Sequence, residues 1–231
     1  MNIDKLDFVK VDNVSSFLDS LIQDVSKKNK ENLVSTFSPF DLAMCPRRLI
    51  YLSNGKKHDF YRNTYFEDNN RQFLCRKWIS YLEKSSKIKV LKKEESIADA
   101  NCNLAGKLDA VINMGGHIFS VKFKFVNSLD FSKVTKDKPF KRDIIESMTY
   151  SWLAETEGGL LIYENNDTQD YLVFHVKNYK PIIQSIKEKC VDLYGYKVKG
   201  VIPVRAYKNK ISKECKQCEF KVSCWKEGEK T

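Results

Sequence analysis

The sequence predicts a mixed α/β fold, because the spacing of its apolar residues changes from a helical period to a strand period and back. Apolar residues recur every three or four positions in the first third of the chain and again over 141–156. Between these regions they alternate with polar residues, as in strands with one buried face. Strands interrupted by helices are typical of mixed α/β domains. A chain of 231 residues, 42% of them hydrophobic, can bury one sizeable core, so we predict a single domain over 1–231.

Three helices are expected before the first strand. Residues 13–27 have an amphipathic pattern, with apolar side chains at Val14, Phe17, Leu18, Leu21, Ile22 and Val25. A second helix is expected to begin with Ser38 as N-cap and Pro39 as its first residue, because both residue types are favoured there. Its apolar stripe is Leu42, Cys45, Leu49 and Leu52. After a polar and aromatic loop over 53–70, a third helix is marked by Phe73, Leu74, Trp78, Ile79 and Leu82.

A β-hairpin is predicted over 104–125, with Gly115 and Gly116 as its turn. Side chains of the second strand alternate between two faces. One face carries Phe119, Val121, Phe123 and Phe125, and the other carries Ile118, Ser120, Lys122 and Lys124.

Helix and strand alternate in the rest of the chain. A helix is expected over 141–156, with a buried side formed by Ile144, Ile145, Met148, Trp152 and Leu153. Two strands follow, with the sequences GLLIYE (159–164) and YLVFHVK (171–177). A last helix is expected near 178–194.

Charge and composition narrow the class of partner and the compartment. The formal net charge of +10 suits a polyanion, because lysines and arginines release counterions from a phosphate backbone. No apolar run is long enough to cross a bilayer, so no membrane partner is expected. The first residues, MNIDKLDFVK, include acidic side chains and do not form a secretory signal. We therefore expect a cytoplasmic, reducing compartment, in which the seven cysteines are free thiols or metal ligands.

Four of the cysteines form a candidate metal site. Cys215, Cys218 and Cys224 lie within ten residues of each other, and Cys45 lies far upstream. Thiolates at such short spacing can converge on one metal centre that takes four ligands. Zinc sites usually draw their ligands as two local pairs, so three cysteines plus one distant cysteine favour iron–sulfur over zinc. The other three cysteines have no partners at ligand spacing and are expected in the core: Cys75, Cys102 and Cys190.

Two segments carry a resemblance to a known family. The segment SPFDLAMCPRRLIY (38–51) and the C-x2-C-x5-C tail resemble the iron–sulfur nucleases of the RecB-like branch of the PD-(D/E)XK superfamily. These include the CRISPR-adaptation exonucleases and the AddB nuclease domain. The resemblance implies a restriction-endonuclease-like core over 87–195, with a mixed sheet flanked by helices, a helical region over 1–86 and a cysteine-rich tail over 196–231. It also implies a 4Fe-4S cluster that staples the tail to the helical region, held by Cys45, Cys215, Cys218 and Cys224.

The same resemblance implies an active site. The family signature is G-x-x-D, then E-x-K after a hairpin turn, then Q-x-x-x-Y on a helix. This sequence has Gly106-Lys-Leu-Asp109, Ser120-Val-Lys122 and Glu146-Ser-Met-Thr-Tyr150. By resemblance, metal ions clamp the scissile phosphate, and we expect Asp109 and Glu146 to hold Mg²⁺ or Mn²⁺ here. Lys122 then orients or activates water, and Tyr150 supports the site. Phosphate contacts with DNA are assigned to Arg47, Arg48 and lysines of the tail.

Two departures from the signature concern the metal. Ser120 stands where the family has glutamate, and a neutral hydroxyl is a weak metal ligand. Glu146 stands where the family has glutamine, so a helix carboxylate could supply the missing charge. Some restriction endonucleases of the superfamily resemble this arrangement, with S-x-K on the strand and a migrated glutamate at shorter spacing. Asp143 lies on the same helix face as Glu146 and is a second candidate.

The histidine that the family carries on the helix before the first strand has no evident counterpart. Gln72 or Phe73 lies near its expected position. The histidines of this chain are expected to have no role in the site: His58, His117 and His175.

The residues leave more than one function open. The first is a metal-dependent DNA nuclease, acting as an endonuclease or exonuclease on single- or double-stranded substrate. The alternative is a catalytically degenerate member that binds DNA or assembles with protein partners as a subunit of a larger complex. A third is a zinc-stabilised, partner-binding protein without nucleic acid.

Overall fold

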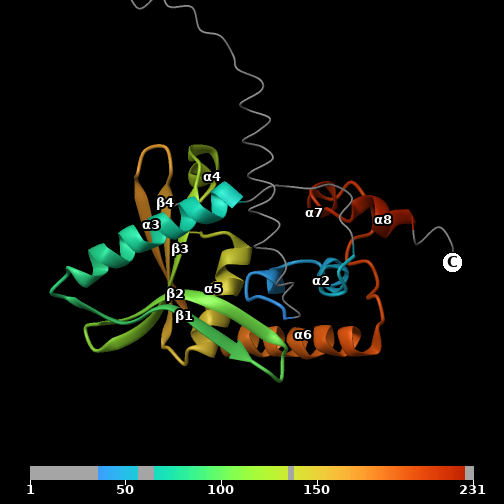
Figure 1. Cartoon of the computed structure of the whole chain (residues 1–231), viewed down its shortest axis with the longest axis horizontal. Helices are drawn as coiled ribbons and strands as arrows, with labels where there is room; N and C mark the ends of the chain where they lie inside the picture. The colour runs from blue at the N-terminus through green and yellow to red at the C-terminus, as the bar shows by residue number, and fades with distance from the viewer. Residues whose placement is uncertain (1–35, 57–64, 135–137, 227–231) are drawn as a thin grey trace, which may run out of the picture.

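A five-stranded mixed sheet lies at the centre of the computed structural model, which describes residues 36–56, 65–134 and 138–226 (Figure 1). The predicted helix over 13–27 and His58 lie outside the described residues. The strand order is β1-β2-β3-β4-β5, with bounds Ile88–Asp99, Leu104–Met114, His117–Val126, Gly158–Asn165 and Tyr171–Lys177. Neighbouring strands are antiparallel except β3 and β4, which are parallel. The connection between these two contains α4 (Ser128–Lys133) and α5 (Lys141–Leu153). The predicted α/β fold class is confirmed.

The predicted hairpin is confirmed as β2 and β3. Its turn residues Gly115 and Gly116 have φ of 64° and 91°, which L side chains rarely adopt. The phenylalanine face of β3 packs with the buried Cys75 and Ile79 of α3 (Tyr65–Glu83). This helix therefore covers one face of the sheet. It begins earlier than predicted, because its first six residues were expected to belong to the loop over 53–70.

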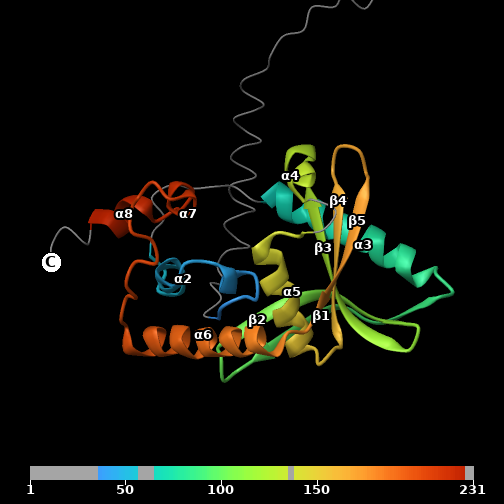
Figure 2. The same ribbon diagram turned by 180° about the vertical axis from the view of Figure 1, so that it is seen from behind.

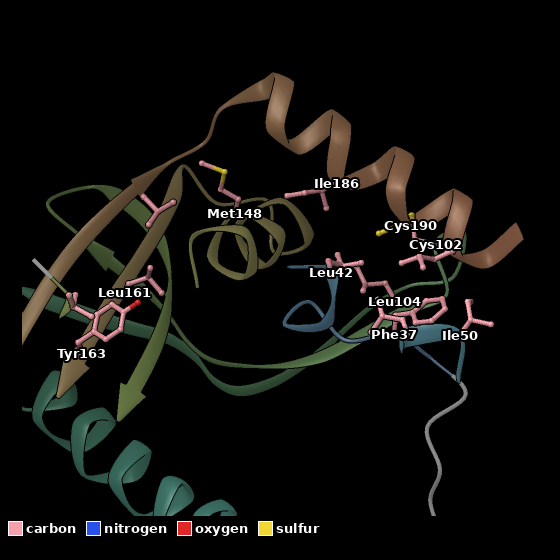
Figure 3. Packing of buried hydrophobic residues seen from close by; sticks show 14 residues of the cluster. Phe37, Leu42, Ile50, Cys102, Leu104, Met148, Leu161, Tyr163, Ile186 and Cys190 are labelled. Atoms are coloured by element: carbon pink, nitrogen blue, oxygen red, sulfur yellow. The ribbon is translucent and has the colours of Figure 1, made fainter. Parts of the chain in front are cut away.

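The other face of the sheet packs on α5, α6 (Lys180–Lys199) and the segment 36–53 (Figures 1 and 2). Figure 3 shows side chains from four elements meeting there: Leu42 before α2, Leu161 of β4, Met148 of α5 and Ile186 of α6. Cys102 and Cys190 lie together in the same cluster, and Cys75 lies in the cluster under α3, so all three are core residues as predicted.

The predicted apolar stripe of α5 packs on the core: Met148 is fully buried, and the others are partly buried against the same cluster, namely Ile144, Ile145, Trp152 and Leu153. A second, polar side of the helix is buried as well. The other buried residues of the helix are Asp143, Glu146, Ser147, Thr149, Tyr150 and Ser151. A polar helix face against the middle of a sheet is costly unless its groups are paired, and such faces are often functional.

The second helix begins later than predicted. A 3-10 turn, η2 (Asp41–Ala43), comes first, and α2 runs over Pro46–Ser53 with Cys45 at its N-cap. Ser38 is not the N-cap: Phe40 precedes η2, and Ser38 Oγ donates instead to Asp41 Oδ2 (2.7 Å). A helix continuous from Pro39 is excluded by Pro46, which has no N–H to donate to an earlier turn.

The C-terminal tail packs against α2, beyond the end of α6 (Figures 1 and 2). It contains α7 (Lys213–Lys216) and α8 (Lys221–Lys226). Arg48 Nε donates to both carboxylate oxygens of Glu219 (3.1 and 2.9 Å), and the buried Phe220 ring lies 5.4 Å from that of Tyr51. Within the described part of the chain, no helix is long and apolar enough to cross a membrane.

Candidate active site

Asp109 lies where β2 and β3 separate. The ladder between these strands ends at the pair Ala110–Val121. Beyond it, the backbone N–H of Phe123 donates to Asp109 Oδ2 (2.9 Å) in place of a strand partner. The side chain of Asp109 thus fills the split between the strands and is 5% exposed as a residue.

Two cations reach the Asp109 carboxylate from opposite sides of the sheet. Lys122 Nζ donates to Oδ1 (2.9 Å), and Arg71 Nη2, from α3, lies 3.0 Å from Oδ1 and 3.1 Å from Oδ2. Burial by itself raises the pKa of Asp109, but Lys122, Arg71 and the Phe123 N–H outweigh it and lower the pKa. Asp109 is therefore ionised at neutral pH.

Lys122 is the centre of the arrangement and is surrounded by oxygens. Besides Asp109, its Nζ donates to the backbone carbonyl of Lys107 (3.1 Å) and lies 3.9 Å from Glu146 Oε1. The ring of Tyr150 lies 4.7 Å away. The structure thus brings together all four residues predicted for catalysis: Asp109, Lys122, Glu146 and Tyr150.

A second lysine, Lys124, pairs with the two carboxylates of α5. Its Nζ donates to Glu146 Oε2 and lies 3.1 Å from Asp143 Oδ1. Asp143 also accepts a hydrogen bond from Tyr163 Oη, and burial together with Asp143 raises the pKa of that tyrosine. The second candidate carboxylate thus lies beside Glu146, held by β3 and β4.

The donor set fits a hard divalent cation in kind. Asp109, Glu146 and the Lys107 carbonyl all present oxygens around Lys122, and Mg²⁺ and Mn²⁺ prefer oxygen ligands. Four cations pair with these carboxylates and Asp143: Arg71, Lys122, Lys124 and Arg142. In the described ranges, no three His, Cys, Asp or Glu side chains are grouped as a set that could hold a metal ion.

Gly106 allows α5 to approach β2 beside the site. A Cβ at this position would lie 2.5 Å from Tyr150 Oη and 2.7 Å from Pro39 Cδ. The glycine of the G-x-x-D segment is therefore required by close contact. Burial, Glu146 and Asp109 raise the pKa of Tyr150, so its hydroxyl stays protonated.

Among the described residues, Ser120 has no hydrogen bond to Asp109, Asp143 or Glu146. It is 1% exposed, and its Oγ donates to the Gly158 carbonyl at 3.4 Å. A Cβ at Gly159 would lie 2.0 Å from Ser147 Oγ and 3.4 Å from Ser120 Oγ, so α5 packs here through small residues. The negative charge near Lys122 therefore comes from Asp109 of β2 and Glu146 of α5, and not from position 120.

The side chain that α3 contributes to the site is Arg71, which the sequence had not indicated. Phe73 is 69% exposed, and Gln72 is also exposed. Arg71 lies four positions before the buried Cys75, so the two share a face of the helix, and this spacing could have identified Arg71 from the sequence. Of the two described histidines, His117 pairs with Glu157 (2.7 Å) and His175 packs its ring on Phe119, both away from the carboxylates.

The residues proposed for phosphate contacts have partners within the chain. Arg48 pairs with Glu219, and Arg47 donates to Tyr51 Oη (3.0 Å) and to the Pro203 carbonyl (3.1 Å). Both arginines thus connect α2 with the tail.

The four candidate cluster cysteines differ from the other three in exposure. They are half-buried, whereas the core cysteines are fully buried. Burial raises the pKa of the Cys218 thiol, and Glu219 and Cys45 add to this, which indicates that Cys45 lies near the tail. The thiols of Cys45 and Cys218 therefore lie near each other, although the described residues contain no group of three or more side chains that could hold a metal ion.

Known structures share this fold. Comparisons with protein-family models and with curated proteins find no match. Among solved structures, SSO0001 is 20% identical with a TM-score of 0.55, covering 90% of this chain and 96% of its own. The alkaline exonuclease LHK-Exo from Laribacter hongkongensis is 12% identical with a TM-score of 0.56, over 72% of this chain and 90% of its own. A phage-related exonuclease from Haemophilus somnus 129PT is 11% identical with a TM-score of 0.51, over 71% and 94%. The chain therefore has a nuclease-type fold.

Proposed function

We propose that this chain is a metal-dependent deoxyribonuclease of the RecB-like type. The observation that carries the proposal is the buried grouping of Asp109 and Glu146 around Lys122 in a nuclease-type fold. Asp109 and Glu146 would hold Mg²⁺ or Mn²⁺, which supplies a water of lowered pKa and charge stabilisation at the scissile phosphate. Lys122 fixes the positions of the two carboxylates by pairing with both, and its ammonium group orients a water molecule. Tyr150 closes the site with its ring on Lys122 and its hydroxyl against Gly106.

DNA is the proposed partner because the surface is basic. Between Val201 and Lys226, seven lysines and arginines stand against two glutamates, and one of these glutamates is paired with Arg48. Such a segment attracts a phosphate backbone and makes binding depend strongly on salt.

A 4Fe-4S cluster held by Cys45, Cys215, Cys218 and Cys224 is part of the proposal. The donor set consists of four half-exposed thiols from α2 and the tail. A cluster there would cross-link the two segments and requires a reducing compartment. Iron and labile sulfide in anaerobically purified protein test this, and zinc without iron would contradict it.

The test of the activity is cleavage of single- and double-stranded DNA with Mn²⁺ by anaerobically purified protein. Lys122→Ala and Asp109→Asn should each lower the rate at least about a hundredfold. Lys93→Ala is the matched control, because Lys93 is 62% exposed and pairs only with Glu83 among the contacts described. Cleavage that survives in Asp109→Asn would rule out this site.

A second function is favoured by the balance of charge. The three carboxylates pair with four cations, so their charge is offset without a metal, and Ser120 supplies no further charge; the cations are Arg71, Lys122, Lys124 and Arg142. A degenerate nuclease-fold protein that binds DNA, or joins a larger complex, fits this balance. It predicts salt-dependent DNA binding by cluster-loaded protein with no Mn²⁺-dependent cleavage.

A further inference from the structure

Arg71 reaches Asp109 from the opposite side of the sheet to Lys122. Its helix, α3, packs against the face of β3 that carries Phe123, whereas Lys122 points to the face covered by α5. A single guanidinium nitrogen, Nη2, contacts both carboxylate oxygens, at 3.0 and 3.1 Å. This contact is possible because β2 and β3 separate at Asp109.

The acceptor positions of the Asp109 carboxylate are all taken. A carboxylate offers about four lone-pair sites. Oδ1 accepts from Arg71 and Lys122, and Oδ2 accepts from Arg71 and the Phe123 N–H. A metal ion that binds Asp109 must therefore displace one of these donors.

Arg71 is the donor that can leave. The Phe123 N–H is fixed in the backbone of β3, next to the end of a ladder. The Lys122 side chain is 4% exposed, so withdrawing it from Asp109 would strand a buried ammonium. The Arg71 side chain is 42% exposed, so its guanidinium can turn to solvent or to a ligand, while an incoming metal replaces its charge at the buried Asp109.

We propose that Arg71 is a latch on Asp109, that is, a partner that substrate can displace. In the free protein the Arg71 guanidinium occupies a metal-binding position of Asp109, and when substrate binds it moves to a nucleic-acid phosphate. This inference rests on the proposed nuclease function. Guanidinium groups bind phosphate as readily as carboxylate, so an incoming phosphate competes for Arg71. When Arg71 leaves, Asp109 becomes open to Mg²⁺ or Mn²⁺. Metal and nucleic acid then bind cooperatively, each raising the affinity of the other by the same factor.

The test is calorimetric titration of the full chain with Mn²⁺, with and without a single-stranded phosphorothioate oligonucleotide that resists cleavage. In the unmodified protein the oligonucleotide should raise Mn²⁺ affinity about tenfold. In Arg71→Gln, Mn²⁺ should bind about tenfold more tightly without oligonucleotide, and its addition should change the affinity less than about twofold. Arg71→Lys keeps the charge and should lie between the two; it decides the question if Arg71→Gln does not fold.

Arg76→Gln is the control, because Arg76 is on the same helix, is 68% exposed and lies 4.0 Å from Glu94. It should leave both Mn²⁺ affinities unchanged. Mn²⁺ binding that is lost in Asp109→Asn but is the same in Arg71→Gln as in the unmodified protein overturns the latch and leaves the proposed function intact. Absence of Mn²⁺ binding in every protein overturns both.

Discussion

Ser120 and Glu146, the two departures from the family signature, depend on each other through packing. Ser120, Ser147 and Gly159 are small, and their contact allows α5 to lie close to β3 and β4. That closeness puts Glu146 Oε1 3.9 Å from Lys122. A larger side chain at position 120 would push the helix away, so the carboxylate can come from the helix only while the strand position stays small.

Restoring the family glutamate should therefore not restore a family-like site. Ser120→Glu places a buried charge under α5 and should lower the free energy of unfolding by at least about 3 kcal/mol. Ser120→Ala, the control, loses one weak hydrogen bond and should cost about 0.5–1.5 kcal/mol. Urea denaturation measures both. A stable Ser120→Glu, Glu146→Gln double variant that cleaves DNA would show that the carboxylate can return to the strand.

The helix α2 links the sheet core to the tail. On one side, Lys189 of α6 donates to the Leu42 and Met44 carbonyls (2.6 and 2.9 Å), just before Cys45. On the other side, Arg48 pairs with Glu219, and Tyr51 packs on Phe220. The tail is thus held by side chains of one short helix, apart from any cluster.

Phe220 should be the main anchor of the tail, because it is fully buried. Phe220→Ala removes an aromatic ring from a packed site, a change that costs about 3–5 kcal/mol. Since the tail contacts the rest of the chain through α2, we expect local release, seen as faster tryptic cleavage at the lysines after Arg205 while the sheet core stays intact. Val204→Ala is the control, since Val204 is 85% exposed. Equal cleavage rates in the two variants would mean that Phe220 does not hold the tail.

Across the whole molecule, the sheet was easier to predict than the helix contacts. The β2–β3 hairpin follows from the alternation of apolar and polar residues in β3 and from a Gly-Gly turn, which are local signals. Asp109, Lys122 and Glu146 were found because the resemblance gave their spacing. Arg71 was missed because its partner is 38 positions away and on another element. The spacing of Asp143 and Glu146 placed both on one face of α5, but the sequence did not indicate that this face is buried. Hydrophobic periodicity assumes an apolar core, whereas this face packs on paired charges.

The seven cysteines should divide into two classes by their reactivity toward an alkylating reagent. Burial raises the pKa of Cys75 to about 11 and that of Cys190 to about 12, and it raises the pKa of Cys102 as well. Fewer thiolates form there at pH 8, so these cysteines should react slowly with iodoacetamide in folded, cluster-free protein. The half-exposed class should react faster because its thiols are accessible: Cys45, Cys215, Cys218 and Cys224. Within this class Cys218 should be the slowest, since burial raises its pKa.

Loading the protein with iron and sulfide should then protect the fast class together, as read by mass spectrometry of the alkylated peptides, because a cluster takes thiolates as ligands. The three buried cysteines are the internal control, and their rates of alkylation should not change. Protection of the three tail cysteines without Cys45 would mean that the metal does not join the tail to α2.

The raised pKa values of the buried cysteines also imply a pH dependence of stability. Their contribution to the free energy of unfolding is fully present below the unfolded thiol pKa of about 9 and is lost as pH rises toward the folded values. The urea concentration at the midpoint of unfolding should therefore fall between pH 8 and pH 11, and it should fall less steeply in Cys190→Ala.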